Sequence, residues 1–307
     1  MTDRRLKDHG ASIRQRLLNH AKEHGDNFQR VLTRYAIERL LYRLSKTEAA
    51  ETYILKGAML YLTWPEHVFR PTGDLDLLGH GDSDPAAIAE LFTRICQIDE
   101  PVDGIVFDPA TLKTAPIREE DKYQGVRLTL RGVLAKAVIP LQVDIGFGDR
   151  VYPEPNRANF PGLLEGLPPA SVLMYPPETV VAEKLQAMIH LGEANTRIKD
   201  FYDIWVTTRT FPFDLAVIVE AISGTLRRRE TAAPVGTPVA LTPQFAELPE
   251  KQRLWTAFLR RNPPTLPPPP FGDMLAELRR FLEPVLGTLA LPESAKGRWN
   301  HDRGAWE

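Results

Sequence analysis

Polar and hydrophobic positions alternate at residues 74–77, and the stretch 70–77 that contains them organises our interpretation of the whole chain. Asp74 and Asp76 alternate there with two leucines, directly after a loop that contains Thr72 and Gly73. Successive side chains of a β-strand point to opposite faces of the sheet. The stretch therefore predicts a strand whose leucines enter a core while its two carboxylates share the other face.

A second alternating stretch, residues 137–146, predicts a strand in which Asp144 lies opposite an apolar set. A lone aspartate in such a strand is costly unless it is paired or bound to a metal. Carboxylates that lie close together repel one another, and a hard divalent cation with oxygen ligands relieves that repulsion. Asp74, Asp76 and Asp144 therefore predict a site for Mg²⁺ or Mn²⁺. The alternative for Asp74 and Asp76 is ordinary solvated polarity at a strand end.

The remaining periodicity predicts a strand-rich N-terminal half and a helical C-terminal half, which is an α+β organisation. Apolar spacing predicts helices over residues 9–23, 28–45, 59–64, 84–96, 178–191, 213–226, 249–261 and 275–286, with another that begins near residue 197. Strands are expected at 53–55, 105–107 and 126–131 as well. Residues 150–177 are rich in proline and glycine and predict a long loop between the halves. We expect domains at 1–150 and 151–292, followed by a disordered tail at 293–307.

Lys56 and Gly57 follow the strand expected at 53–55 and precede an apolar helix. A glycine at such a junction lets the backbone approach a ligand closely, and the N-terminus of a helix favours phosphate. The alternative is that Gly57 only makes a turn.

In the helical half, Lys184 lies within the helix expected at 178–191, and Asp200 and Asp203 lie one helical turn apart in the next helix. Acidic residues near the start of a helix are favoured by its dipole, so exposed capping is the alternative to a functional role for this pair.

Composition narrows the partners and the compartment. The chain has 307 residues with 43% hydrophobic and 25% charged content, and Cys96 is its single cysteine, which excludes an intrachain disulfide and a thiolate zinc cluster. Its predicted role is that of a small core residue. No apolar run approaches the ~20 residues that span a bilayer, so we expect a cytoplasmic protein without a membrane partner.

Charge is distributed unevenly along the chain. Residues 1–50 carry eleven Lys/Arg against six Asp/Glu, and basic clusters recur at 227–229, 260–261 and 279–280. Such clusters suit a polyanionic partner, although solvated helix faces explain each single cluster equally well.

Four blocks of residues, taken in order, resemble the AbiEii/AbiGii toxins, the nucleotidyltransferase-like toxins of type IV toxin–antitoxin systems, which belong to the DNA polymerase β-like nucleotidyltransferase superfamily. The resemblance covers roughly residues 28–285. The blocks are Leu55-Lys56-Gly57-Ala58, the stretch from Arg70 to Leu77, Val143-Asp144-Ile145, and Glu183-Lys184-Leu185 with Arg197-x-Lys199-Asp200-x-x-Asp203. The resemblance implies a mixed β-sheet flanked by helices, with a helical C-terminal half that closes over a nucleotide.

The resemblance also implies roles for individual residues. Asp74 and Asp76 match the metal-binding pair, Asp144 matches the third carboxylate, and Thr72 stands where many relatives carry serine. Lys184 matches the lysine that holds the NTP phosphates, and Asp200 matches the acidic residue of the last motif, with a catalytic or positioning role. Lys56, Gly57 and Gly73 complete the expected nucleotide-binding set, and Asp203 is expected to support Asp200 rather than to contact the nucleotide.

These roles predict a nucleotidyltransferase that uses Mg²⁺ or Mn²⁺ and an NTP as substrate. We expect transfer of an NMP to RNA, with the tRNA 3′ end as the favoured acceptor, and a cognate antitoxin as a protein partner. Two alternatives stay open. One is nucleotidylation of a protein side chain by the same site, and the other is a nucleotide-binding regulatory module without turnover.

Overall fold

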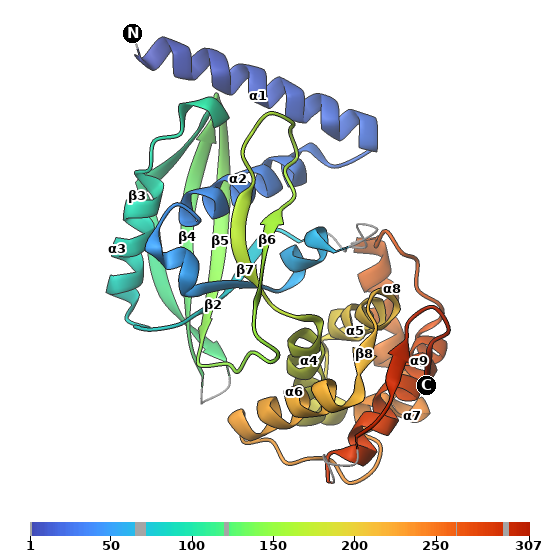
Figure 1. Ribbon diagram of the computed structural model, residues 1–307. Helices are drawn as coiled ribbons and strands as arrows, with labels where there is room; N and C mark the ends of the chain where they lie inside the picture. The colour runs from blue at the N-terminus through green and yellow to red at the C-terminus, as the bar shows by residue number, and fades with distance from the viewer. Residues whose placement is uncertain (1, 65–71, 120–122, 262, 291–294) are drawn as a thin grey trace. The chain divides into compact units, whose positions relative to one another are not determined.

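The computed structural model describes residues 2–64, 72–119, 123–261, 263–290 and 295–307. These residues form two compact units (Figure 1). Described residues up to Thr63, from 72 to Gly148 and from Asn156 to Met174 form the first unit. Trp64, Asp149–Pro155 and the described residues from Tyr175 onward form the second.

The first unit is built on a mixed β-sheet. Among the described residues its seven strands follow the order β3-β4-β5-β2-β1-β7-β6, with β2 parallel to β5, β1 parallel to β7, and the other neighbours antiparallel. The strands are β1 (Tyr53–Lys56), β2 (Asp74–Gly79), β3 (Ile105–Glu119), β4 (Tyr123–Leu134), β5 (Ala137–Phe147), β6 (Asn156–Phe160) and β7 (Ala170–Met174). The expected mixed sheet with flanking helices is therefore confirmed.

Burial alternates along the central strands, which gives the sheet one covered and one more exposed face. In β5 the side chains of Leu141, Val143 and Ile145 are buried, whereas Gln142 and Asp144 between them are half-buried. Helix α2 (Phe28–Leu44) packs against β5 and β7, and α3 (Pro85–Cys96) packs against β3 and α2. Helix α1 (Thr2–His24) packs against α2. The apolar half of each alternating strand therefore builds the core of this unit.

Helix α2 differs from the amphipathic helix that its arginines suggest. Arg39 and Arg43 are buried, and their guanidinium groups bind the buried carboxylate of Asp103, with Arg39 Nε at 3.0 Å and Arg43 Nη1 at 2.7 Å. A buried charge is tolerated only when it is paired and hydrogen-bonded, and here two arginines share one carboxylate. Through Asp103, these two arginines connect α2 to the turn before β3. They are therefore not part of a basic surface.

Two further stretches depart from the pattern-based predictions. Residues 150–177, expected as a loop, contain β6 and β7, because Phe160, Val172 and Met174 are buried despite the surrounding prolines and glycines. Residues 298–306, expected within a disordered tail, contain strands β9 (Arg298–Asn300) and β10 (Ala305–Trp306). Residues 291–294 of that tail lie outside the described residues.

The second unit is mainly helical, as expected for the C-terminal half. Helix α4 packs on α5 and α6, while α9 packs on α5, α6 and α7. The helices are α4 (Pro177–Leu191), α5 (Ile198–Thr210), α6 (Leu215–Arg228), α7 (Pro243–Glu247), α8 (Pro249–Arg261) and α9 (Phe271–Thr288), with short 3₁₀ turns between α4 and α5 and between α6 and α7. Strand β8 (Phe213–Asp214) pairs with β9, and β9 pairs with β10. None of the described helices is both long and apolar enough to cross a bilayer.

Aromatic packing explains why residues 298–306 are structured. The Trp299 indole donates a hydrogen bond to the Thr208 carbonyl at 2.7 Å, and the Trp306 indole donates one to the Phe281 carbonyl at 2.9 Å. The ring of Phe281 contacts both tryptophan rings. Two tryptophans with satisfied N–H groups bury enough surface to order a short segment that has no apolar periodicity.

Candidate active site

The three aspartates predicted to bind metal lie on two adjacent strands of the first unit, on the more exposed face of the sheet. In β2, Asp74 is exposed and Asp76 is half-buried, while the leucines at 75 and 77 are buried. Strand β5 runs parallel to β2, and Asp144 is the direct Cα partner of Asp76. The register therefore gathers all three carboxylates along two neighbouring strands.

Gly57 fits closely against this carboxylate face. It follows β1, whose last residue, Lys56, is the Cα partner of Asp76. Its φ of +68° lies in the left-handed region, and a Cβ placed there would lie 2.0 Å from Asp76 Oδ2 and 2.7 Å from Asp76 Cβ. Only glycine avoids both the strain and the clash. The glycine expected to approach a ligand thus also makes room for one of the predicted catalytic carboxylates.

Thr72 and Gly73 lie in the loop that enters β2, where Thr72 is half-buried and Gly73 is exposed. A Cβ added at Gly73 would meet no atom within 4 Å, so packing within the described chain does not require glycine there. Arg70 and Pro71, which belong to the same sequence block, lie outside the described residues. The nucleotide-binding role of Thr72 and Gly73 stays a prediction.

Sequence reasoning missed the residue that binds Asp144. Arg127 of β4 is the Cα partner of Asp144. Its Nε donates to Asp144 Oδ1 at 2.8 Å and its Nη2 donates to Oδ2 at 2.7 Å, while Gln142 Nε2 donates to Oδ2 at 3.3 Å. The hydrogen bond to Asp144 is the main cause that raises the pKa of Arg127, and the charges of Asp74 and Asp76 add to it. Arg127 lies in the strand expected at 126–131, but only the register between β4 and β5 reveals its partner.

The carboxylates fit a hard divalent cation in the kind of donor they supply, since Mg²⁺ and Mn²⁺ prefer carboxylate oxygen. Their present arrangement is not a preformed metal centre. Within the described residues no group of three His, Cys, Asp or Glu side chains is placed to hold a metal ion. Both oxygens of Asp144 are instead used by the guanidinium of Arg127.

In the second unit, the predicted site residues of α4 and α5 form a cluster of their own contacts. Lys184 Nζ lies 2.9 Å from Asp200 Oδ1 and 2.8 Å from Asp203 Oδ2, and Arg197 Nε donates to Asp200 Oδ2 at 2.7 Å. Both aspartates are buried, so they are not exposed capping residues. Burial disfavours the ionised form of Asp200, but Lys184 and Arg197 outweigh it and hold the pKa of this carboxyl below its usual range.

A second polar network on α4 involves residues that sequence reasoning left without a role. Glu183 accepts a hydrogen bond from the Tyr175 hydroxyl at 2.9 Å, and its other oxygen lies 3.7 Å from Arg229 Nη2. Arg229 also donates to Asp149 Oδ1, at 2.9 and 3.1 Å. Arg229 is therefore held inside the unit, and the basic cluster at 227–229 does not present three accessible cations.

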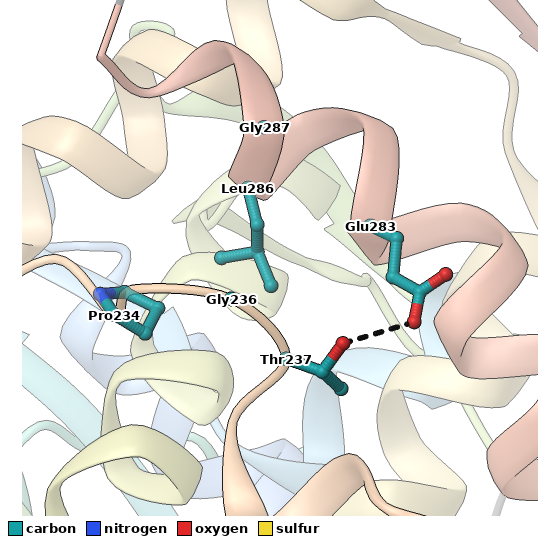
Figure 2. A pocket seen from close by; sticks show the side chains of 6 residues that line it. All are labelled: Pro234, Gly236, Thr237, Glu283, Leu286 and Gly287. Atoms are coloured by element: carbon teal, nitrogen blue, oxygen red, sulfur yellow. Dashed lines mark hydrogen bonds between the residues drawn. The ribbon is translucent and has the colours of Figure 1, made fainter.

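Cys96 and the pocket of the helical unit contribute nothing to these two clusters. Cys96 is buried, as expected of a core residue. A pocket of about 340 Å³ lies between α9 and the segment before α7 (Figure 2), and the Thr237 hydroxyl there donates to Glu283 Oε1 at 3.1 Å. The pocket is lined by Pro234, Gly236, Thr237, Glu283, Leu286 and Gly287, none of which is a predicted site residue.

Burial raises the pKa of the Cys96 thiol to about 12. The thiolate is the reactive form, so at pH 8 the folded protein should react with a disulfide reagent at least about a hundred times more slowly than a free thiol of ordinary pKa. Unfolding in guanidinium chloride should restore the ordinary rate. A fast reaction of the native protein would show that this residue is accessible.

Residues 39–277 match the family described as "Nucleotidyl transferase AbiEii toxin, Type IV TA system". Because this match spans most of the chain, the protein belongs to the AbiEii family and is a nucleotidyltransferase toxin of a type IV toxin–antitoxin system. The family implies an NTP substrate and an antitoxin partner.

Two solved structures are similar to this chain. JHP933 from Helicobacter pylori has 14% sequence identity and a TM-score of 0.47, over 89% of this chain and 93% of that chain. A structure described as a "putative nucleotidyltransferase from H. pylori" has 16% identity and a TM-score of 0.47, over 89% of this chain and 96% of that chain. No curated protein sequence matches the chain.

Proposed function

We propose that this chain transfers an NMP from an NTP to a hydroxyl of RNA, with the tRNA 3′ end as the favoured acceptor. The observation that carries the proposal is the register of β2 and β5, which pairs Asp76 with Asp144 and leaves Asp74 on the same face. Membership of the AbiEii family supports the reaction class. In the reaction, the acceptor oxygen bonds to the α-phosphorus of the NTP and pyrophosphate leaves.

Asp74, Asp76 and Asp144 would hold Mg²⁺ or Mn²⁺ in this reaction. A bound divalent metal neutralises the triphosphate and stabilises the attacking and leaving oxygens of an in-line displacement. Asp144 is the carboxylate we assign to receive the proton of the incoming hydroxyl. The backbone at Gly57 and Gly73 and the side chains of Lys56 and Thr72 would contact the nucleotide.

We assign Lys184 to the phosphates of the NTP and Asp200 to the positioning of Lys184, with Asp203 supporting both. An ammonium group offsets charge that builds up on departing pyrophosphate. The contacts of Lys184 with two carboxylates support this positioning role, and they also mean that a phosphate must compete with those carboxylates for Lys184.

Two cations on the carboxylate face favour a polyanionic acceptor over a protein side chain. Arg131 is four residues after Arg127 on β4 and is exposed, and Lys113 of β3 is the exposed Cα partner of Thr129, which lies between them. Alternate residues of a strand share a face, so both cations accompany Asp144 on its side of the sheet. Lysine and arginine in such positions bind phosphodiester oxygens without reading the sequence.

The acceptor is tested by incubating the protein with each labelled NTP and Mg²⁺ in the presence of either total RNA or cell protein. Label is expected in RNA, and Asp76→Asn is the control that separates transfer from contamination. Label in protein alone would replace RNA with nucleotidylation of a protein side chain. Binding of NTP without label in either fraction would favour the non-catalytic module.

The acceptor surface is tested by the double variant Lys113→Ala/Arg131→Ala. We expect the KM for RNA to rise roughly ten-fold while the KM for NTP stays within about two-fold, because each lost phosphate contact weakens RNA binding alone. The salt dependence of RNA binding should become shallower by roughly 0.7 in log–log slope for each lost contact. Lys136→Ala, in the turn after β4, is the control for loss of one exposed positive charge. An unchanged KM for RNA would remove this surface from the proposal.

A further inference from the structure

Arg127 and Asp144 form a contact of two hydrogen bonds on the carboxylate face. The guanidinium meets the carboxylate as a fork, with one N–H group on each oxygen at 2.8 and 2.7 Å. Two parallel hydrogen bonds of this kind fix the orientation of a carboxylate and satisfy it in the plane of the fork. The oxygens that a divalent cation would need are therefore already engaged.

The fork sits at one end of a charged row across the sheet. Consecutive Cα partners on β4, β5, β2 and β1 are Arg127, Asp144, Asp76 and Lys56, so two carboxylates lie between two basic residues. The Arg127 side chain is 45% exposed and that of Asp144 is 19% exposed. An ion pair with this much solvent access holds weakly enough to be exchanged for another partner.

We propose that Arg127 is the resident counter-cation of Asp144, and that a divalent metal displaces it when Asp144 becomes a metal ligand. The inference rests on the proposed function, because it takes Asp144 to be one of the three metal ligands. A guanidinium and a metal ion compete for the same two carboxylate oxygens, so the pair is a barrier to metal binding rather than a support for it. Once released, the planar fork of Arg127 matches phosphate, the anion that enters with the nucleotide.

If Arg127 instead supported metal binding, its removal would change the metal affinity in the opposite direction. An arginine that only orients Asp144 for the metal would strengthen metal binding, as partners of metal ligands commonly do. Removing Arg127 would then weaken metal binding, whereas removing a competing cation would strengthen it. The sign of the change in metal affinity therefore separates the two roles without any measurement of nucleotidyl transfer.

The test is a titration of the whole chain with Mn²⁺, without NTP or RNA, in which free Mn²⁺ is followed by electron paramagnetic resonance. Arg127→Gln is expected to lower the Kd for Mn²⁺ roughly three- to five-fold, the size expected for loss of one partly exposed ion pair. Arg127→Lys keeps the charge but cannot form the fork, and it should lie between the wild type and Arg127→Gln.

Arg131→Gln is the matched control, because it removes the same charge from the same face of β4, where its Cα partner on β5 is Pro140. It should leave the Kd for Mn²⁺ within about two-fold, since only long-range charge changes. Asp144→Asn should remove the gain that Arg127→Gln produces, so the double variant shows coupling between the two residues. Circular dichroism and thermal unfolding would establish that each variant is folded.

The outcomes distinguish this inference from the proposed function. If the wild type binds Mn²⁺ and Arg127→Gln binds it equally or more weakly, the displacement model is wrong while the metal assignment survives. If neither protein binds Mn²⁺, the metal assignment to Asp74, Asp76 and Asp144 fails, and the inference fails with it. If Arg131→Gln increased the affinity for Mn²⁺ as much as Arg127→Gln does, the increase would come from the lower positive charge of the face alone. That result would also overturn the inference.

Discussion

Replacing Gly57 with alanine is expected to lower nucleotidyl transfer by at least about a hundred-fold, because displacing a catalytic group by an ångström costs about that much. The added methyl group would lie 2.0 Å from Asp76 Oδ2 and 2.7 Å from Asp76 Cβ. The Cβ atom cannot move without its strand, so rotation of the carboxylate alone does not relieve the clash. The change therefore displaces β2 at the position where Asp76 pairs with Asp144.

Gly25→Ala is the matched control for backbone strain. Gly25 has a φ of +66°, nearly the same as Gly57, but a Cβ there would meet no atom within 4 Å. Left-handed strain alone should lower the free energy of unfolding by about 1–2 kcal/mol in both variants. Gly57→Ala should lower the free energy of unfolding further than Gly25→Ala does, and it alone should lose nucleotidyl transfer.

Transfer rates and urea unfolding of the two variants measure these effects. Full transfer activity in Gly57→Ala would show that Asp76 is not held where the reaction needs it. Equal destabilisation of the two variants would show that the clash is relieved at no cost.

Local patterns predicted the carboxylate face well, because strand alternation depends only on neighbouring residues. Asp74, Asp76 and Asp144 lie opposite buried leucine, valine and isoleucine side chains, as alternation requires. The pairing of Asp76 with Asp144 required the order and register of β2 and β5, which no local pattern contains. Arg127 was missed for the same reason, since its role depends on which strand lies beside β4.

The predictions that failed did so for one physical reason. A partner distant in sequence changes the free energy of burying a residue, and no local pattern contains that partner. Arg39 and Arg43 look like surface residues until Asp103 supplies a buried counter-charge. Trp299 and Trp306 lie in a segment without periodicity, yet Phe281 gives them a surface on which to pack. The type of each side chain indicates only how it behaves in isolation. Its partners, which are distant in sequence, decide whether it is buried in the fold.

Lys184→Ala is expected to lower the free energy of unfolding by about 3–5 kcal/mol, because it removes one partner of a buried ion pair. Asp200 and Asp203 are 1% and 0% exposed at their side chains, and each loses the ammonium group within 2.9 Å. Arg197 still binds Asp200 after the change, so this carboxylate keeps one cationic partner. Thermal and urea unfolding would measure the loss. A change below about 1 kcal/mol would show that the ion pairs contribute little.

Loss of transfer in Lys184→Ala alone would not separate chemistry from folding, because the same lysine serves both. The triple variant Lys184→Met/Asp200→Asn/Asp203→Asn separates them, since replacing a whole buried ion cluster by neutral groups of similar size commonly restores stability. We expect this variant to unfold near the wild-type temperature and still to lack transfer, because no ammonium group remains for the NTP phosphates. If the triple variant recovered both transfer and stability, the cluster would be purely structural. The phosphate-binding cation would then be sought on the carboxylate face, where Lys56 and Arg127 flank Asp76 and Asp144.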